Sequence, residues 1–172
     1  MRSYTSELKN KIGESVLLKG WVHDVRLLGG IAFLLLRDKD GIVQCTLKGV
    51  SDEILNEVKK IHQEDVIEIV GKVVKSEIAK QGIEVQVERF KILNKAAVPL
   101  PLDPREVTPA NLDTKLNWRF LYFRTKEARA IFRIQTTILK AVREFFLERG
   151  FIEMQPPCII ASASEGGAEL FS

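Results

Sequence analysis

Alternating apolar and polar positions dominate the first half of the chain. Successive side chains of a β-strand point to opposite faces of its sheet, so this alternation predicts strands with one buried face. Turn sequences at Gly29-Gly30, Asp40-Gly41 and Gln81-Gly82 separate several of these segments, as hairpins require. The predicted strands are residues 16–26, 31–38, 42–47, 66–75 and 83–93.

Helical spacing appears in two other segments. Residues 51–62 begin with Ser51 as a candidate cap and carry acids in the first turn and basic residues in the last, which predicts a short helix. Thr125 is a candidate cap for a longer helix over residues 126–149, which Gly150 would end. The apolar stripe of that helix is formed by Ile131, Ile134, Ile138, Leu139, Val142, Phe145 and Phe146.

Three strands, a helix and two further strands follow one another in the order of an OB-fold. That fold is a five-stranded barrel, and it commonly binds oligonucleotides on the face of its second and third strands. Residues 95–124 contain Pro99, Pro101, Pro104 and Pro109, each of which fixes φ and removes a hydrogen-bond donor. We therefore predict a stiff linker after the barrel.

The pattern as a whole predicts an α+β chain in which a hinge joins two domains. The barrel would occupy residues 1–94, the hinge residues 95–124 and the second domain residues 125–172. In the second domain, residues 151–154 are expected to form a short strand after the long helix. One helix and short strands cannot bury both faces of a core, so we expect this domain to be incomplete by itself.

Basic residues accumulate around the start of the second domain. The whole chain carries a net charge of only +3, but residues 114–143 contain eight basic residues and one acid, Glu127. Such a bias attracts polyanions, and a solvated helix face explains it equally well. The basic residues are Lys115, Arg119, Arg124, Lys126, Arg129, Arg133, Lys140 and Arg143.

Several classes of site and location do not fit the composition. Cys45, Cys158 and the two histidines, His23 and His62, lack the spacing of metal ligands, so we expect no metal site and interpret both cysteines as buried free thiols. The first residues hold no apolar segment typical of a signal peptide, and no apolar run reaches the roughly 20 residues of a membrane span. These features predict a cytoplasmic protein without a membrane partner.

One face of the predicted barrel combines side chains suited to unpaired nucleotides. Alternation places Val22 and Leu34 on one face, and Phe33 and Arg37 on the other. Aromatic rings stack on bases, while guanidinium groups and amides such as that of Gln44 bind phosphates and base edges. Taken alone, Phe33 fits a core position better than a stacking position.

Four segments carry motifs in a specific order. Residues 20–44 read GWVHDVRLLGGIAFLLLRDKDGIVQ, and VPLPLDP is followed by LDTKLNWRF. Further along, the chain reads AVREFFLERGFIEMQPPCI and then ASASEGGAELF. In this order they resemble the anticodon-binding barrel, the hinge, motif 1 and the amino-acid pocket loop of class II aminoacyl-tRNA synthetases. The resemblance is to the aspartyl, asparaginyl and lysyl subgroup, and is closest to the archaeal-type aspartyl enzymes.

The resemblance implies tRNA anticodon-binding roles for five barrel residues. Phe33 matches the aromatic that stacks on an anticodon base, and Gln44 matches the amide that reads the central uridine. Arg26 matches the basic residue beside them, and Glu84 lies near anticodon-reading groups of the last strand. His23 stands where members strict for tRNA-Asp tend to carry Trp and relaxed members tend to carry His, which favours tRNA-Asn as a second substrate.

The resemblance also implies roles near the end of the chain. Pro157 matches the motif 1 proline and, with Phe146, implies a homodimer interface. The loop motif is similar to a mobile loop whose glutamate approaches the ammonium group of the substrate, aspartate. The loop residues implied to bind the amino acid are Ser164, Glu165, Gly166 and Gly167.

The parent enzyme implied by the resemblance activates aspartate with ATP and Mg²⁺ and transfers it from the adenylate to tRNA. Motifs 2 and 3, which supply ATP-binding arginines, would lie beyond Ser172, so we expect an N-terminal fragment without catalytic residues or aminoacylation activity. Tyr122 departs from the family by replacing an acid. Two alternatives stay open: a fragment of an asparaginyl-tRNA synthetase, and a free-standing tRNA-binding barrel without catalysis. DNA is not an expected partner.

Overall fold

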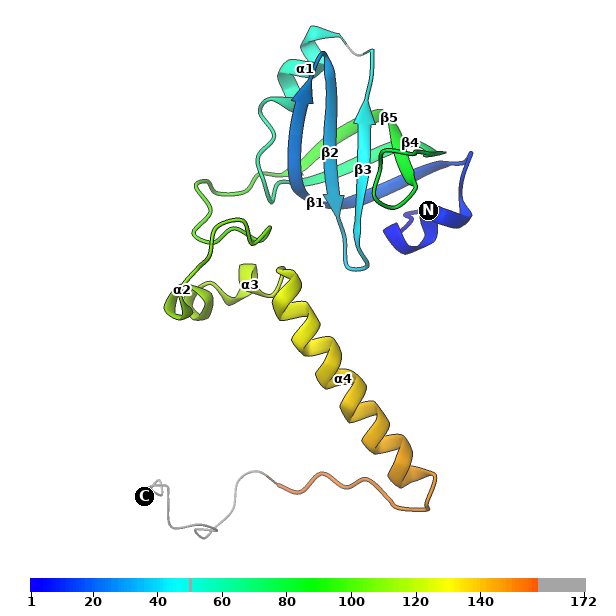
Figure 1. Cartoon of the computed structure of the whole chain (residues 1–172), viewed down its shortest axis with the longest axis vertical. Helices are drawn as coiled ribbons and strands as arrows, with labels where there is room; N and C mark the ends of the chain where they lie inside the picture. The colour runs from blue at the N-terminus through cyan, green and yellow to red at the C-terminus, as the bar shows by residue number, and fades with distance from the viewer. Residues whose placement is uncertain (50, 158–172) are drawn as a thin grey trace. The chain divides into compact units, whose positions relative to one another are not determined.

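The computed structural model describes residues 1–49 and 51–157 (Figure 1). The chain divides into two compact units, Met1–Tyr122 and Phe123–Ser172. The first contains the strands, and the second contains the long helix.

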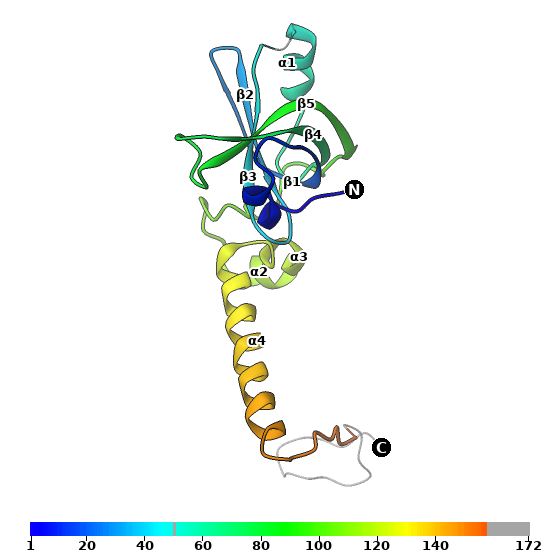
Figure 2. The same cartoon turned by 90° about the vertical axis from the view of Figure 1, so that its right-hand side faces the viewer.

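Five strands of the first unit close into a barrel in the order β1-β2-β3-β5-β4 (Figures 1 and 2). The β3–β5 pair is parallel and the other neighbours are antiparallel. The barrel and its strand order confirm the predicted OB-fold. The strands are β1 (Ser15–Leu28), β2 (Ile31–Arg37), β3 (Ile42–Leu47), β4 (Val66–Lys75) and β5 (Ile83–Asn94).

The interior of the barrel is filled by the apolar members of the alternating pattern. Val22 and Leu34 are fully buried, as predicted, whereas Phe33 is only half-buried and lies outside the core. Helix α1 (Asp52–Val58) lies at one end of the barrel, where Val58 joins the core (Figure 2). The largest fully buried side chains are Leu8, Leu18, Leu34, Leu36, Leu47, Ile67, Ile69, Val22, Val43, Val58, Val73 and Val85.

Closure depends on a close backbone approach at Gly20. Strand β1 pairs with β4 up to Trp21 and with β2 from Trp21 onward, so it passes from one neighbour to the other at this point. A Cβ atom on Gly20 would lie 2.3 Å from the carbonyl oxygen of Arg37. Glycine is therefore required here for the strands to come together.

Short helices at two places differ from the sequence-based expectations. Helix α1 ends at Val58, earlier than the predicted residue 62, and Ser51 occupies its N-cap position without a side-chain capping bond. The predicted linker contains two unpredicted helices, α2 (Leu112–Asn117) and α3 (Arg119–Tyr122). A further turn of 3-10 helix, Thr5–Asn10, precedes the barrel.

The linker is anchored to the barrel by the buried carboxylate of Asp65. Its oxygens accept hydrogen bonds from the backbone N–H groups of His62 and Ala96, at 3.0 and 2.7 Å, and from Lys95 Nζ at 2.9 Å. Burial alone raises the pKa of Asp65, but these three donors outweigh it and hold the pKa below its usual value.

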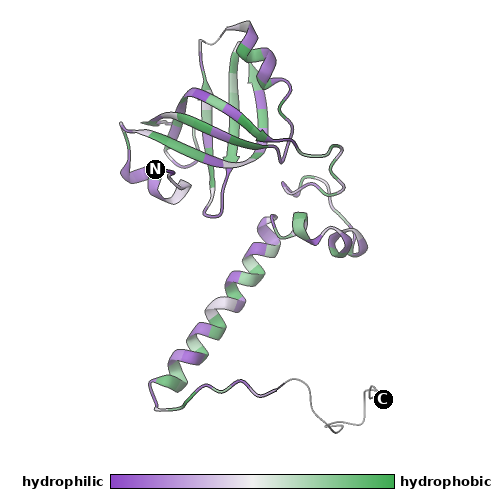
Figure 3. Ribbon diagram, turned by 180° about the vertical axis from the view of Figure 1, so that it is seen from behind, coloured by the Kyte–Doolittle hydropathy of each residue, from purple (hydrophilic) through white to green (hydrophobic). Residues whose placement is uncertain are grey.

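The second unit consists mainly of helix α4 (Lys126–Leu147). Thr125 caps it as predicted, since its Oγ1 accepts the backbone N–H of Ala128 at 3.2 Å, and Gly150 follows its end with φ of +81°. Figure 3 shows apolar and polar residues alternating along α4. The strand predicted at residues 151–154 is wrong, because these residues have no β-partner in the part of the chain that the structure describes.

Candidate nucleic-acid interface

Cross-strand register aligns two rows of side chains on the outside of the barrel. In the first row, Arg26 of β1 pairs with Phe33 of β2, which pairs with Thr46 of β3. Thr46 in turn pairs with Gln86 of β5. Residues directly opposite one another in neighbouring strands share a face, so this row crosses four strands on one surface.

The second row lies two residues along the strands from the first. Asp24 pairs with Leu35, and Leu35 pairs with Gln44. Leu35 and Gln44 are half-buried, in contrast with the fully buried residues that precede and follow them in the strands. The two rows together place an aromatic ring, a guanidinium group and an amide side by side, as expected for a surface that binds unpaired bases.

A β-bulge at His23 brings Asp24 and Arg26 onto this surface. Val22 pairs with Leu36, and Asp24 pairs with Leu35, which is adjacent to Leu36 in β2. His23, which stands between Val22 and Asp24, is therefore an extra residue in β1. If β1 kept a regular pleat through His23, strict alternation from the buried Val22 would turn Arg26 toward the core. The alternation of apolar and polar residues in the sequence did not reveal this bulge.

Glu84 lies beneath Gln44 and is only 6% exposed. Its Oε2 accepts hydrogen bonds from Gln44 Nε2 at 2.9 Å and from Thr46 Oγ1 at 3.0 Å. Lys48 Nζ stands 3.7 Å from Oε1. The predicted site residue Glu84 thus forms hydrogen bonds with side chains of the outer surface. Its own side chain contributes little exposed area.

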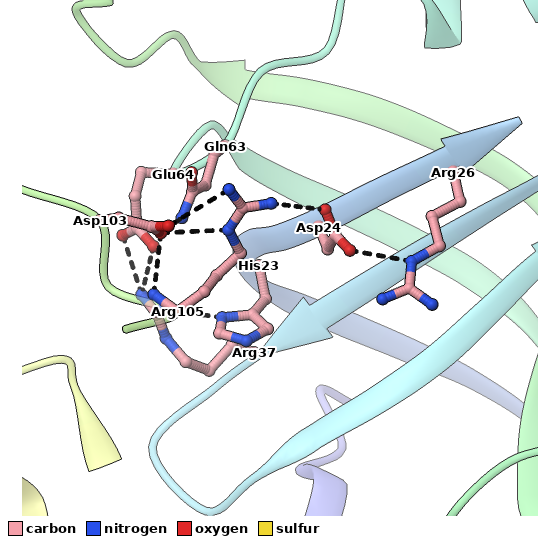
Figure 4. A network of polar contacts seen from close by, with 8 residues as sticks. All are labelled: His23, Asp24, Arg26, Arg37, Gln63, Glu64, Asp103 and Arg105. Atoms are coloured by element: carbon pink, nitrogen blue, oxygen red, sulfur yellow. Dashed lines mark hydrogen bonds and ion pairs between the residues drawn. The ribbon is translucent and has the colours of Figure 1, made fainter. Parts of the chain in front are cut away.

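Arg26 belongs to a chain of polar contacts that reaches the linker (Figure 4). Asp24 accepts hydrogen bonds from Arg26 Nε and from Arg105 Nη1, both at 3.0 Å. Arg105 also donates to Asp103, which receives Gln63 Nε2 at 2.8 Å. The sequence reasoning missed Asp24 and Arg105, because no local pattern relates residues separated by 81 positions.

His23 is half-buried beside a buried ion pair (Figure 4). Arg37 Nη2 lies 2.8 Å from the carboxylate of Glu64, and Arg37 Nη1 lies 3.3 Å from His23 Nδ1. Because arginine only donates, Nδ1 of His23 accepts and the ring carries its proton on Nε2. Burial and then the charge of Arg37 lower the pKa of His23, which favours this neutral form.

Arg37 differs from its expected place on the surface. It lies on the same side of β2 as Phe33, but only 3% of it is exposed and it contacts Glu64. A buried, paired guanidinium organises the strand end rather than binding a ligand directly. Arg26, whose side chain is 70% exposed, supplies the accessible guanidinium of the surface.

A hollow of about 350 Å³ lies beside the first row. It extends the candidate surface across β3, β4 and β5 and contributes two ammonium groups that could contact phosphates. Its lining residues are Thr46, Lys48, Lys72, Gln86, Val87 and Glu88.

The candidate dimer residues lie in the second unit. Phe146 is 45% exposed and makes edge-to-face contacts with Phe145 and Phe151, at centroid distances of 5.4 and 5.2 Å. Pro157 is exposed at the end of the described segment. The predicted pocket-loop residues, Ser164, Glu165, Gly166 and Gly167, lie outside the described residues, as does Cys158.

Within residues 1–49 and 51–157, the structure shows neither a metal-binding cluster nor a membrane-spanning helix. No group of three His, Cys, Asp or Glu residues there could hold a metal ion. Cys45 is buried, and that burial raises the pKa of its thiol. Among the helices of this part of the chain, none combines the length and apolar character needed to cross a membrane.

Two family models match the chain. The model described as OB-fold nucleic acid binding domain matches residues 16–93, and that of tRNA synthetases class II (D, K and N) matches residues 111–172. These matches cover the barrel and the segment containing α2, α3 and α4.

Individual proteins and structures agree with both models. The Aspartate--tRNA(Asp/Asn) ligase of Archaeoglobus fulgidus is 48% identical over 99% of this chain and 40% of its own length. The Aspartate--tRNA(Asp) ligase of Thermococcus kodakarensis is 47% identical over 98% of this chain and 39% of its own length. The asparaginyl-tRNA synthetase of Pyrococcus horikoshii, in complex with asparaginyl-adenylate, superimposes with a TM-score of 0.88 at 33% identity, covering 99% of this chain and 40% of that structure.

The chain thus spans about 40% of the length of the curated relatives it matches. The anticodon-domain fold, the class II match and the near-complete coverage of the chain by these relatives agree with one another. The chain belongs to the class II aminoacyl-tRNA synthetases of the aspartyl, asparaginyl and lysyl group, and corresponds to their N-terminal part.

Proposed function

We propose that this chain selects the tRNA for an aspartate–tRNA ligase, which attaches aspartate to tRNA-Asp through an aspartyl-adenylate formed from ATP. The observation that carries the proposal is the pair of rows on the outer barrel surface, with Phe33, Arg26 and Gln44 on one face. Relatives with aspartate–tRNA ligase names, nearly half identical over the whole chain, support the same enzyme.

Within this proposal, the three parts of the chain have different tasks. Residues 1–94 bind the anticodon, residues 95–124 form the hinge, and residues 125–172 begin the catalytic domain. Contacts from Asp65 and Asp24 to the linker support a hinge that is held against the barrel.

Each surface residue has a chemical task. Phe33 stacks on an anticodon base, Gln44 reads the central uridine, and Arg26 contacts the backbone or base beside them. Asp24 holds the Arg26 guanidinium in place through the 3.0 Å hydrogen bond to Nε. Glu84 contributes to this surface by accepting the hydrogen bonds of Gln44 and Thr46.

The choice between tRNA-Asp alone and both tRNA-Asp and tRNA-Asn centres on His23. Its neutral ring offers an N–H donor at Nε2, since Nδ1 faces Arg37. We propose the relaxed choice, because this position carries His and the Archaeoglobus relative has an Asp/Asn name. The asparaginyl reading is the second candidate, favoured by the TM-score of 0.88 to the Pyrococcus asparaginyl enzyme.

The parent enzyme would use ATP as a substrate, and a bound Mg²⁺ would polarise and position its phosphate during adenylate formation. The described residues do not fit a metal site, since they contain no suitable cluster of ligands. The described residues therefore have no proposed role in adenylate formation. The amino-acid pocket loop, Ser164 to Gly167, is proposed to contact aspartate.

Helix α4 is proposed to contribute to a homodimer. Its exposed apolar stripe, which includes Phe146, and the exposed Pro157 at the end of the described segment would be covered by the partner subunit. Charging of tRNA serves translation, so we propose that the protein acts in the cytoplasm.

Binding of anticodon stem-loop RNA to the 172-residue chain tests the proposal. We expect a fluorescently labelled tRNA-Asp stem-loop to bind more tightly than stem-loops with a changed central base. Phe33→Ala should weaken binding by about 1–3 kcal/mol, because one stacking contact is lost. Leu112→Ala, at a 68% exposed position outside both rows, is the control that should bind normally. Equal affinity for every loop sequence would overturn the proposal.

A further inference from the structure

The side chains of Gln44 and Glu84 are joined by a hydrogen bond that has only one chemically sensible direction. Gln44 Nε2 lies 2.9 Å from Glu84 Oε2, which also receives Thr46 Oγ1 at 3.0 Å and Ser76 Oγ at 3.4 Å. A carboxylate only accepts hydrogen bonds, whereas an amide has a donating NH₂ and an accepting oxygen. The NH₂ group of Gln44 must therefore face Glu84.

This direction determines what Gln44 offers to a ligand. With its NH₂ group committed to Glu84, the amide presents Oε1, an acceptor, and the structure shows no protein partner for that oxygen within the described residues. Gln44 is half-buried on the outer surface, in the row next to Phe33. A base stacked on Phe33 would therefore face the acceptor Oε1 of Gln44. Without Glu84, the amide could rotate and present either its oxygen or its NH₂ group.

An acceptor at this point distinguishes the two pyrimidines. Uracil carries a hydrogen-bond donor at N3, whereas cytosine carries an acceptor there and its donor on N4. With Oε1 of Gln44 placed against N3, cytosine would therefore bring two acceptors together. Facing two acceptors costs binding free energy, because neither can be satisfied once water is excluded.

We propose that Glu84 is a positioning residue that locks the Gln44 amide with its oxygen outward and so selects uracil against cytosine. The inference rests on the proposed function, in which Gln44 reads an anticodon base. Glu84 acts through Gln44, because only 6% of Glu84 is exposed.

Glu84 also has a structural position, which the test must separate from selection. It lies on β5 beside the short parallel pair in which Cys45 opposes Val85. Its loss could therefore loosen the seam between β3 and β5. A loosened seam would weaken binding to all RNAs alike, whereas a freed amide would change the preference between bases.

The experiment measures the affinity of the 172-residue chain for two anticodon stem-loops that differ only in uracil or cytosine at the central position. Glu84→Gln replaces the carboxylate by an amide that can donate or accept, so we expect the preference for uracil to fall about tenfold. Glu53→Gln, at an exposed position of α1 outside the candidate surface, should keep the wild-type preference. Thermal melting of each variant reports on folding.

A paired exchange supplies the sharper test. Gln44→Glu alone places two carboxylates together and should weaken binding of both loops. The double variant Gln44→Glu/Glu84→Gln restores a donor facing an acceptor and again presents an acceptor outward, so the preference for uracil should return. A structural role alone does not predict that recovery.

The possible results separate the inference from the proposal beneath it. Loss of preference in both Gln44→Ala and Glu84→Gln, with recovery in the double variant, supports the inference. Loss in Gln44→Ala with full preference in Glu84→Gln overturns the inference and leaves the role of Gln44 standing. No change of preference in Gln44→Ala overturns the proposed reading by Gln44, and the inference with it.

Discussion

The inner face of the barrel and the apolar stripe of α4 place large hydrophobic side chains in opposite environments. Leu34, Ile69 and Val85 are 0% exposed, whereas Ile134 and Ile138 are 61% and 57% exposed. Fully burying such a side chain stabilises a fold by about 1.5–3 kcal/mol, and an exposed one contributes little of this. The barrel is therefore stabilised by its own core, while α4 relies on local interactions and on contacts with whatever covers its stripe.

The comparison shows that regular apolar spacing predicts which side chains share one face of a strand or helix. It does not predict whether that face is buried. Both regions follow the period of their secondary structure, and both periods were read correctly from the sequence. Only the barrel has neighbouring strands that close over its apolar side. A helix with a large apolar stripe and no cover within the described chain is typical of a segment that packs against another subunit or domain.

The largest expected difference between the two regions comes from matched truncations. Leu34→Ala should lower the free energy of unfolding by about 2–5 kcal/mol, because it leaves a cavity in the core. Ile134→Ala should change it by less than about 0.5 kcal/mol. Urea unfolding followed by far-ultraviolet circular dichroism measures both losses, because this signal includes the strands of the first unit and helix α4 of the second. Similar losses for both variants would contradict the comparison.

A glycine pair tests how tightly the barrel is closed. Gly20→Ala should destabilise the barrel by about 1–3 kcal/mol or more, because the added methyl group meets the Arg37 carbonyl oxygen. At Gly41 the nearest atom to an added Cβ is the hydroxyl of Thr5, at 3.3 Å, so Gly41→Ala serves as the milder control. Thermal melting of the two variants should rank them in this order, and equal melting temperatures would argue against a tight corner at Gly20.

Local stabilisation of α4 can be measured at its N-cap. Thr125→Ala removes the acceptor for the Ala128 N–H and should destabilise the helix by about 1 kcal/mol. Hydrogen exchange should become faster in residues 126–147 and stay unchanged in the barrel strands. Thr125→Ser, which keeps the hydroxyl, should exchange like the wild type. Slower exchange or a response confined to the barrel would show that α4 is stabilised in another way.

The smallest effect concerns pH, where burial perturbs a charge in the barrel. The pKa of His23 is lowered in the folded state, so below about pH 6.5 the unfolded chain takes up the proton first. This contribution to stability is present above that pH and is lost as the pH falls through the folded pKa. The rise of the melting temperature from about pH 5 to 7 should be smaller in His23→Gln. An equal rise of the melting temperature in His23→Gln and the wild type would contradict this assignment.

The sequence predicted the features that depend on local patterns. The five strands, the two buried residues Val22 and Leu34, and the Thr125 cap all follow from alternation or from capping chemistry. The aromatic and amide of the candidate surface were also found, because they stand on predicted strands. Their proposed roles came from a family resemblance and stay predictions.

Features that depend on contacts between distant residues could not be predicted. The helices α2 and α3 lie in a proline-rich segment whose composition indicates an extended chain. The Asp24–Arg105 contact depends on how the linker packs on the barrel. The buried ion pair of Arg37 and Glu64 depends on how the end of β2 meets the segment before β4. The error at residues 151–154 has the same origin, because a strand exists only where a partner strand is available.

The bulge at His23 makes the strand pairing around this position independent of which side chain the position carries. The extra residue interrupts the β1–β2 register, while Val22, Asp24 and Arg26 on either side occupy fixed positions. Exchanging His23 for another residue therefore leaves the neighbouring surface in place, whereas a regular pleat through His23, without the bulge, would turn Asp24 and Arg26 toward the interior. Under the role proposed for His23, a position of this kind would let single substitutions change the choice of tRNA while the strand length and the fold stay the same.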